Sequence, residues 1–483
     1  MTGQFFALQK PPVFYPGLML LLTDATVMCQ ASGSSSWWRL TPDPTGSYSN
    51  GTWSRLADSP TSPLWFASAV LRDGRVFFAG GEYSDDIKTD LNTAAIYDPV
   101  ANTWTSINGP VGWTALGDLV NCVLPDGRVL IGAIDSPACA IYDPDTNGWK
   151  PAADKNNDSS NEETWTLLPD RTVLTVNCDG PKGTQRYLID KDFWIDCGET
   201  PFDLVEKASK EIGPALLMPD GRCFCIGATG RTAWYTPPHV ATDQGMWTDG
   251  PVLPMADRRP LGAKDAPACL MPNGKILMAL GPLDGTKDNY LGPTYIYEWD
   301  PAQPFPTDPI SVQGDDPCEK KRVAPCSWIM LPLPSGEILL SNNAINGASS
   351  MLIYHPDGAA LAAGKPKIIG LPVNKAEKAV LAQGGTFTIT GTLFNGISQA
   401  ASYGDDASMA TNYPIVRLES KAGPAVWYCR TFGHSSMGVA VREVVSTNFT
   451  VPWDVPLGDY DLRVIANGIA SEASLVTVGK VEN

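Results

Sequence analysis

The sequence predicts an all-β protein, a seven-bladed β-propeller followed by a β-sandwich. First, 45 glycines and 42 prolines among 483 residues favour many tight turns over long helices. Second, an apolar strand, a turn and another apolar strand recur along the first three quarters of the chain. Third, most of these hairpins are followed by two more strands, so each repeat holds four strands in roughly fifty residues, as a propeller blade does. Hydrophobic residues make up 43% of the chain, enough for a large core.

Each repeat is centred on a turn whose residues favour a tight hairpin. Asp-Gly and Asn-Gly pairs suit type I′ turns because both central residues take positive φ. The turns are Thr23-Asp24-Ala25, Arg72-Asp73-Gly74, Pro125-Asp126-Gly127, Pro169-Asp170-Arg171, Pro219-Asp220-Gly221, Pro272-Asn273-Gly274 and Pro334-Ser335-Gly336. Seven such turns predict seven blades.

The outer half of each blade carries a strand that ends in an aromatic residue and a strand with a tryptophan. Examples begin at Ala94 (AAIYDPVANTWTSI) and Cys139 (CAIYDPDTNGWKPA). The last copy, around Tyr354, lacks its own tryptophan strand, whereas residues 2–12 resemble the outer strands of other copies. We therefore expect the N-terminus to supply the outermost strand of the seventh blade, which leaves no open sheet edge.

The repeat stops near Pro372, and residues 373–483 read as short alternating strands with glycine and proline turns. Strands of this length and spacing predict a β-sandwich of immunoglobulin-like size. We accordingly expect a propeller over residues 1–372 and a sandwich over residues 373–483, in a monomer.

Charge and targeting signals limit the possible partners. The chain holds 52 Asp+Glu against 35 Lys+Arg, a formal charge of -17, which disfavours binding to nucleic acid and to anionic membranes. The N-terminus shows no signal-peptide pattern, so the chain as written is expected in the cytoplasm.

Eleven cysteines leave at least one thiol unpaired. Cys318 with Cys326, and Cys178 with Cys197, are candidate disulfides, although sequence alone does not fix the pairing.

Four consecutive repeats place an acidic residue at an equivalent point ahead of the hairpin turn. Because the innermost strand of every blade lines the central channel, these residues should form a ring at one mouth. They are Asp118, Glu162 with its neighbour Glu163, Glu211 and Asp265. Crowded carboxylates either share protons or are neutralised by a cation. The alternative is that some accept hydrogen bonds from strand-end amides or pair with nearby basic residues.

One of only three histidines, His434, lies among glycine and hydroxyl residues in Arg430-Thr-Phe-Gly-His-Ser-Ser-Met-Gly438. The stretch suits an exposed loop between two strands. We expect His434, Asp118, Glu162, Glu211 and Asp265 to bind a divalent metal at the propeller axis. Glu163, Glu211 and Asp265 are the candidate catalytic carboxylates. A ligand set of oxygens and one nitrogen suits Ca²⁺, Mg²⁺, Mn²⁺ or Fe²⁺ better than Cu²⁺. A hydrogen-bonded loop histidine is the structural alternative.

Kelch-like blades followed by a sandwich containing RTFGHSSMGVA and VIANGIASEASLVTV resemble the galactose oxidase and glyoxal oxidase superfamily. The resemblance covers essentially the whole chain. It implies that a hairpin of the sandwich enters the channel and gives a histidine to a mononuclear copper, and His434 occupies the motif position of that histidine here. This architecture resembles that of secreted proteins. Members of the superfamily bind copper through a cysteine, a tyrosine and a Tyr-His pair. The matching positions here are Asp118, Glu162 and Cys326-Ser327, so the copper-radical pair is missing.

Three functions remain open at this stage. The leading one is a metal-dependent enzyme of unassigned reaction, acting on a small molecule at the axis. The second is a propeller that binds carbohydrate or protein without catalysis. The blade repeat accounts for most tryptophans as packing residues, and Trp37, Trp38 and Trp65 are the ones to consider for stacking on a ligand. The third is a copper oxidase acting on aldehydes or primary alcohols, with Cys326 as the nearest redox residue.

Overall fold

The computed structural model describes the chain over residues 3–85, 87–156, 158–179, 182–283, 290–310, 323–345, 350–372, 379–403 and 409–480. Within these ranges the chain is all-β, with strands and three short 3₁₀ turns, η1 (Ile189–Lys191), η2 (Pro325–Ser327) and η3 (Ala362–Gly364). No helix in this part of the chain is long and apolar enough to cross a membrane. The all-β prediction is confirmed.

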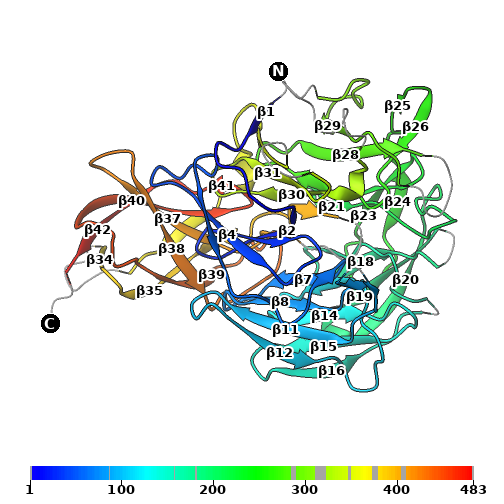
Figure 1. Cartoon of the computed structure of the whole chain (residues 1–483), viewed down its shortest axis with the longest axis horizontal. Coiled ribbons are helices and arrows are strands. Elements are labelled where there is room, and N and C mark those ends of the chain that lie inside the picture. The colour runs from blue at the N-terminus through cyan, green and yellow to red at the C-terminus, as the bar shows by residue number, and fades with distance from the viewer. Residues whose placement is uncertain are drawn as a thin grey trace.

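Most of the strands form antiparallel sheets of four neighbours in chain order, the pattern of propeller blades (Figure 1). The first two are β2 (Pro16–Leu21), β3 (Val27–Ala31), β4 (Trp37–Thr41), β5 (Thr52–Arg55), and β7 (Ala67–Val70), β8 (Val76–Ala79), β11 (Thr93–Asp98), β12 (Thr103–Asn108). The next two are β13 (Asn121–Val123), β14 (Val129–Gly132), β15 (Cys139–Asp143), β16 (Gly148–Ala152), and β17 (Thr166–Leu167), β18 (Thr172–Val176), β19 (Gly183–Leu188), β20 (Phe193–Glu199).

Three further sheets complete the series. One is β21 (Ala215–Leu217), β22 (Cys223–Ile226), β23 (Thr232–Thr236), β24 (Met246–Asp249). The next joins β27 (Ala268–Leu270), β28 (Ile276–Pro282) and β29 (Tyr295–Trp299) with β25 (Met255–Ala256), β26 (Arg259–Gly262) and β36 (Ala401–Ser402). The last is β30 (Trp328–Pro332), β31 (Ile338–Asn342), β32 (Met351–His355) and β1 (Gln4–Ala7). Three short strands form a separate small sheet: β6 (Pro63–Leu64), β9 (Tyr83–Ser84) and β10 (Ile87–Lys88). In the chain, β6 precedes β7, and β9 and β10 lie between β8 and β11.

The N-terminal strand β1 pairs antiparallel with β32, from Gln4 opposite His355 to Ala7 opposite Leu352. The first strand of the chain therefore joins the last sheet of the series, and Figure 1 shows the blue β1 beside the yellow-green strands. Pairing the two ends of the repeat region satisfies the edge of β32 that would otherwise be open.

The aromatic and tryptophan strands pack against each other in four successive sheets. Tyrosine and tryptophan are direct cross-strand partners, with ring centroids 4.9 to 5.3 Å apart. The pairs are Tyr97 and Trp104, Tyr142 and Trp149, Tyr187 and Trp194, and Tyr235 and Trp247. Aromatic cross-strand pairs stabilise sheets, so these tryptophans belong to the framework rather than to a ligand surface.

The C-terminal strands form one long curled sheet at the opposite end of the molecule from β25 and β26 (Figure 1). They are β33 (Lys367–Gly370), β34 (Val380–Ala382), β35 (Thr386–Thr392), β37 (Ile415–Ser420), β38 (Val426–Phe432), β39 (Val445–Thr450), β40 (Gly458–Ala466), β41 (Ile469–Ala470) and β42 (Ser474–Gly479). Strand β38 pairs with β37 along its first half and with β39 along its second half, so the sheet folds over its own apolar core.

The end of β38 and the loop that follows it lie on the hairpin turns of the propeller. The amide of Thr431 donates to Thr23 O at 3.1 Å, that of His434 to Arg72 O at 3.1 Å, and that of Met437 to Pro125 O at 2.9 Å. These three acceptors belong to the turns of three successive sheets. The two parts of the chain therefore meet on the turn side of the propeller.

All ten cysteines in the described residues are free thiols, nine of them buried. Cys178 donates to Glu162 O, and Cys197 accepts from Arg186, so the candidate disulfide between them is not formed. The other candidate involves Cys318, which lies outside the described residues. Burial raises the pKa of the Cys178 and Cys197 thiols and keeps both protonated.

Candidate functional site

The four predicted ring carboxylates line one cavity of about 710 Å³ at the mouth opposite the hairpin turns. Each lies in the segment that leads into the first strand of its sheet: Asp118 before β13, Glu162 before β17, Glu211 before β21 and Asp265 before β27. Asp118, Glu162 and Asp265 each stand eight residues ahead of the turn residues Asp126, Asp170 and Asn273. Equivalent positions in successive repeats thus converge on one space.

Three of the carboxylates come within ligand distance of one another. Oxygen atoms of Glu162, Glu211 and Asp265 all lie within 4.8 Å of each other. Glu162 (φ 58) and Asp265 (φ 43) take left-handed backbone conformations, as does Lys210 (φ 68) just before Glu211. Such conformations cost free energy in residues other than glycine and cluster at functional sites. The backbone therefore directs all three side chains to one point.

Burial and mutual repulsion raise the pKa values in this cluster. The pKa of Glu162 is raised to about 12, first by burial and then by Glu211, Asp118 and Asp265. The pKa of Asp118, which stands apart from the other three, is raised to about 7 by burial and by Glu82. Without a cation, the cluster must therefore hold protons at neutral pH.

Glu211 shows where a ligand atom is lacking. Its Oε1 accepts a hydrogen bond of 2.6 Å from the Tyr290 hydroxyl. Its Oε2 is buried and accepts no hydrogen bond from the described residues. A buried carboxylate oxygen without a partner is costly, and a bound cation is one of the groups that satisfies it.

The remaining walls of the cavity are aromatic on one side and charged at the rim. Trp65 and Tyr403 stack with ring centroids 6.1 Å apart and an interplanar angle of 18°. Trp65 (φ 55) stands eight residues ahead of Asp73, so an indole occupies the place that a carboxylate takes in three other sheets. At the rim, Lys88 Nζ lies 2.8 Å from Glu82 Oε1, and Lys210 forms an ion pair with Asp179.

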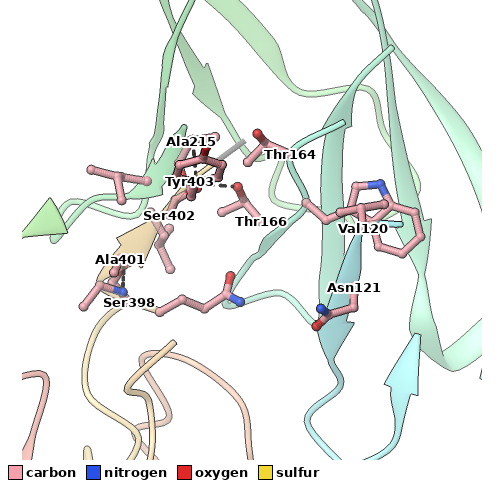
Figure 2. A pocket seen from close by; sticks show the side chains of 14 residues that line it. Val120, Asn121, Thr164, Thr166, Ala215, Ser398, Ala401, Ser402 and Tyr403 are labelled. Atoms are coloured by element: carbon pink, nitrogen blue, oxygen red, sulfur yellow. Dashed lines mark hydrogen bonds between the residues drawn. The ribbon is translucent and has the colours of Figure 1, made fainter. Parts of the chain in front are cut away.

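The channel below the cavity is filled by a segment from the C-terminal part of the chain. Strand β36 pairs with β27, with Ala401 opposite Cys269 and Ser402 opposite Ala268. Gln399 Oε1 accepts from Leu167 N at 2.9 Å, and Tyr403 Oη donates to Cys326 O at 2.7 Å. Figure 2 shows Ser398, Ala401, Ser402 and Tyr403 facing Thr164, Thr166 and Asn121, around a residual space of about 30 Å³ that suits a water molecule.

His434 lies at the other end of the propeller from the carboxylates. Its amide donates a hydrogen bond to Arg72 O in a hairpin turn, at the end of an inner strand. The acidic residues lie before the beginning of the inner strands, at their opposite end. Its Nδ1 is 2.9 Å from Thr447 Oγ1, its ring stacks on Tyr413, and Nε2 is buried without a partner among the described residues. Burial, with Arg430 nearby, lowers its pKa to about 3. The structure does not bring His434 to the acidic cavity; among the described residues of the C-terminal part, Tyr403 is the one that lines it.

Glu163 also faces away from the cavity that its neighbour Glu162 lines. Its carboxylate is completely buried and forms an ion pair with Lys155, and it accepts hydrogen bonds from Trp165 Nε1 at 3.0 Å and Thr175 Oγ1 at 2.9 Å. Burial raises its pKa whereas the charged Lys155 lowers it, and the ion pair with Lys155 holds the carboxylate in its ionised form. These contacts occupy both oxygens, so the geometry gives Glu163 no place at the site.

Comparison with protein-family models and with curated protein sequences found no match. Among solved structures, a fungal alcohol oxidase of the AA5 family in complex with copper matches 99% of this chain and 99% of its own, with 15% identity and a TM-score of 0.51. A streptogramin B lyase (12% identity, TM-score 0.47) covers 74% of this chain and 99% of its own. A virginiamycin B lyase from Staphylococcus aureus (10%, TM-score 0.44) covers 73% and 98%. The first likeness shows that the fold of this chain is shared with that oxidase over the whole chain.

Proposed function

We propose that Glu162, Glu211 and Asp265 bind a hard divalent cation, and that the protein is a metal-dependent enzyme acting on a small polar molecule in the cavity above them. The observation that carries this proposal is the convergence of three carboxylates within 4.8 Å around a buried, unpartnered Glu211 oxygen.

The electrostatics of the cluster favour a cation. Two ionised carboxylates 4.8 Å apart repel by roughly 3.5 kcal/mol at an effective dielectric constant of about 20. A divalent ion attracts each of the carboxylates, and this attraction outweighs their mutual repulsion. The ion also competes with the protons that the cluster otherwise holds. Because all three ligands are oxygens, Ca²⁺, Mg²⁺, Mn²⁺ and Fe²⁺ fit better than Cu²⁺.

When bound, such a cation supplies Lewis-acid polarisation of a substrate oxygen or a more acidic water. Asp118 lines the same cavity but stands apart from the three-carboxylate group, and its raised pKa of about 7 suits a proton acceptor at neutral pH. We assign it the general-base role in place of Glu163. Tyr290 is held protonated by burial and the carboxylates, so it can act only as a hydrogen-bond donor.

A copper oxidase fits these residues less well. Cys326 lines the cavity, but the three groups that converge there are all carboxylates, an oxygen donor set that suits copper less well than nitrogen and sulfur ligands do. A binding function without catalysis is favoured by one observation, the Trp65–Tyr403 stack, which offers an apolar face to a ligand. It predicts ligand binding that survives chelation.

Elemental analysis of the protein, purified without chelator and then dialysed against each candidate ion, tests the proposal. We expect one equivalent of a divalent metal, lost in Glu211→Gln. The control is Glu298→Gln, which alters another buried carboxylate, the partner of Lys275, far from the cavity. A parent protein that retains no metal, or a Glu211→Gln protein that retains it fully, would overturn the cation proposal.

A further inference from the structure

A buried ion-pair cluster lies directly behind the acidic cavity. The Lys155 ammonium group contacts Glu163, lies 2.8 Å from Asp158 Oδ2 and donates to Ser159 O at 2.8 Å. The Lys155 and Glu163 side chains are completely buried. Burial alone would lower the pKa of Lys155, but the two carboxylates outweigh it and raise the pKa, so the lysine stays charged. Buried pairs of this kind are rarely a net gain in stability over apolar residues.

The cluster fixes the chain on the C-terminal side of Glu162. Trp165 Nε1 and Thr175 Oγ1 both donate to Glu163 Oε2, while Lys155 holds Oε1. With both oxygens bound, the Glu163 side chain has no rotational freedom. Thr175 lies on β18, so Glu163 is tied to the second strand of its own sheet.

The Glu162 carbonyl is held as well. The Cys178 thiol donates to Glu162 O at 3.0 Å, and its pKa is raised well above the ordinary value by burial, so it stays a donor. Glu162 itself has φ 58, a conformation that glutamate avoids unless its surroundings impose it. The contacts on either side of this peptide supply that constraint.

We infer that Glu163 is a positioning residue: the Lys155–Glu163 ion pair holds Glu162 in its left-handed conformation, with its carboxylate in the cavity beside Glu211 and Asp265. In a relaxed right-handed or extended conformation, the Glu162 side chain would leave from a different side of the backbone. The consequence for cation affinity rests on the proposed function, whereas the conformational effect does not.

Two variants and one matched control test this role. Glu163→Gln removes the charge and keeps the shape, and Thr175→Val removes one donor with less risk to folding. The control, Asp170→Asn, breaks another ion pair of a fully buried cation, Arg186, at the turn end of the same sheet. All three should lower the melting temperature, so stability alone does not separate them.

Two readouts distinguish positioning from a merely structural role. Crystal structures of Glu163→Gln and Thr175→Val should show residue 162 out of its left-handed conformation, while Asp170→Asn keeps it. The dissociation constant for Mn²⁺, measured by calorimetry, should rise about tenfold in Glu163→Gln, less in Thr175→Val, and not in the control.

The outcomes are separable. A parent protein that binds no Mn²⁺ contradicts the proposed function, and the crystal structures then decide the positioning role alone. Residue 162 unmoved in both variants overturns the inference. Parent-like Mn²⁺ affinity in a variant whose residue 162 has moved supports the positioning role and contradicts the assignment of Glu162 as a cation ligand. If Glu163→Gln does not fold, Thr175→Val carries both readouts.

Discussion

Replacing Glu162 with glutamine separates the effect of the acidic cluster on cation binding from its effect on stability. Because the pKa of Glu162 is raised to about 12, its carboxyl group is protonated at pH 7 in the cation-free protein, and glutamine replaces a neutral group of nearly the same shape. The cation-free melting temperature should therefore change little, corresponding to less than about 1 kcal/mol.

The cation-bound state should respond strongly. At 100 times its dissociation constant, a cation stabilises the folded protein by about 2.7 kcal/mol. Glutamine removes one ligand charge, and a loss of about 2.7 kcal/mol of attraction weakens binding by about 100-fold. The same cation concentration would then stabilise Glu162→Gln by only about 0.4 kcal/mol.

The assay is the melting temperature of parent and Glu162→Gln at pH 7, each with chelator and with a fixed excess of Mn²⁺. We expect equal melting temperatures in chelator and a cation-dependent increase of a few degrees in the parent alone. An equal increase in both proteins would refute the assignment of Glu162 as a ligand. A large loss of stability in chelator would show that its carboxyl group is charged or structurally required.

Three further predictions follow from the same geometry. Since the folded-state pKa of Asp118 is raised from 3.8 to about 7, the folded state binds more protons than the unfolded state in this window; the melting temperature in chelator should fall as pH rises from about 4 to 7, and Asp118→Asn should flatten that slope. Tyr290→Phe removes the donor to Glu211 Oε1 and should change Mn²⁺ affinity by up to about tenfold in calorimetry, with unchanged affinity arguing that the phenol is a bystander. His434→Ala should lower the melting temperature through lost packing on Tyr413 yet leave metal content unchanged, and loss of metal would contradict its placement away from the cavity.

The all-β architecture was predictable because each blade is specified locally. Turns such as Arg72-Asp73-Gly74 fix a hairpin within a few residues, and the Tyr97–Trp104 pairing follows from alternation along two neighbouring strands. The convergence of Asp118, Glu162 and Asp265 was predictable for the same reason, since a position repeated in equivalent blades occupies equivalent places around the axis.

The parts of the site that sequence could not supply depend on contacts between distant segments. The surroundings of His434 are set by Thr447, Tyr413 and the turn at Arg72, none of which its local motif reveals. The sequence shows two adjacent glutamates and does not indicate which one faces the cavity. In the structure, the left-handed conformation of Glu162 and the buried Lys155 beside Glu163 decide it.

Tyr290 and Tyr403, which also line the cavity, were missed for a related reason. Tyr290 lies in a connection between β28 and β29, and Tyr403 comes from the C-terminal part of the chain, so neither occupies the repeated position ahead of a hairpin turn.

Anomalous diffraction from crystals grown with Mn²⁺ tests the cation site most directly. A single strong peak within coordination distance of Glu162, Glu211 and Asp265 is the expected result. A peak beside His434, or an acidic cavity without any peak at saturating Mn²⁺, would contradict the assignment of this cluster as the metal centre.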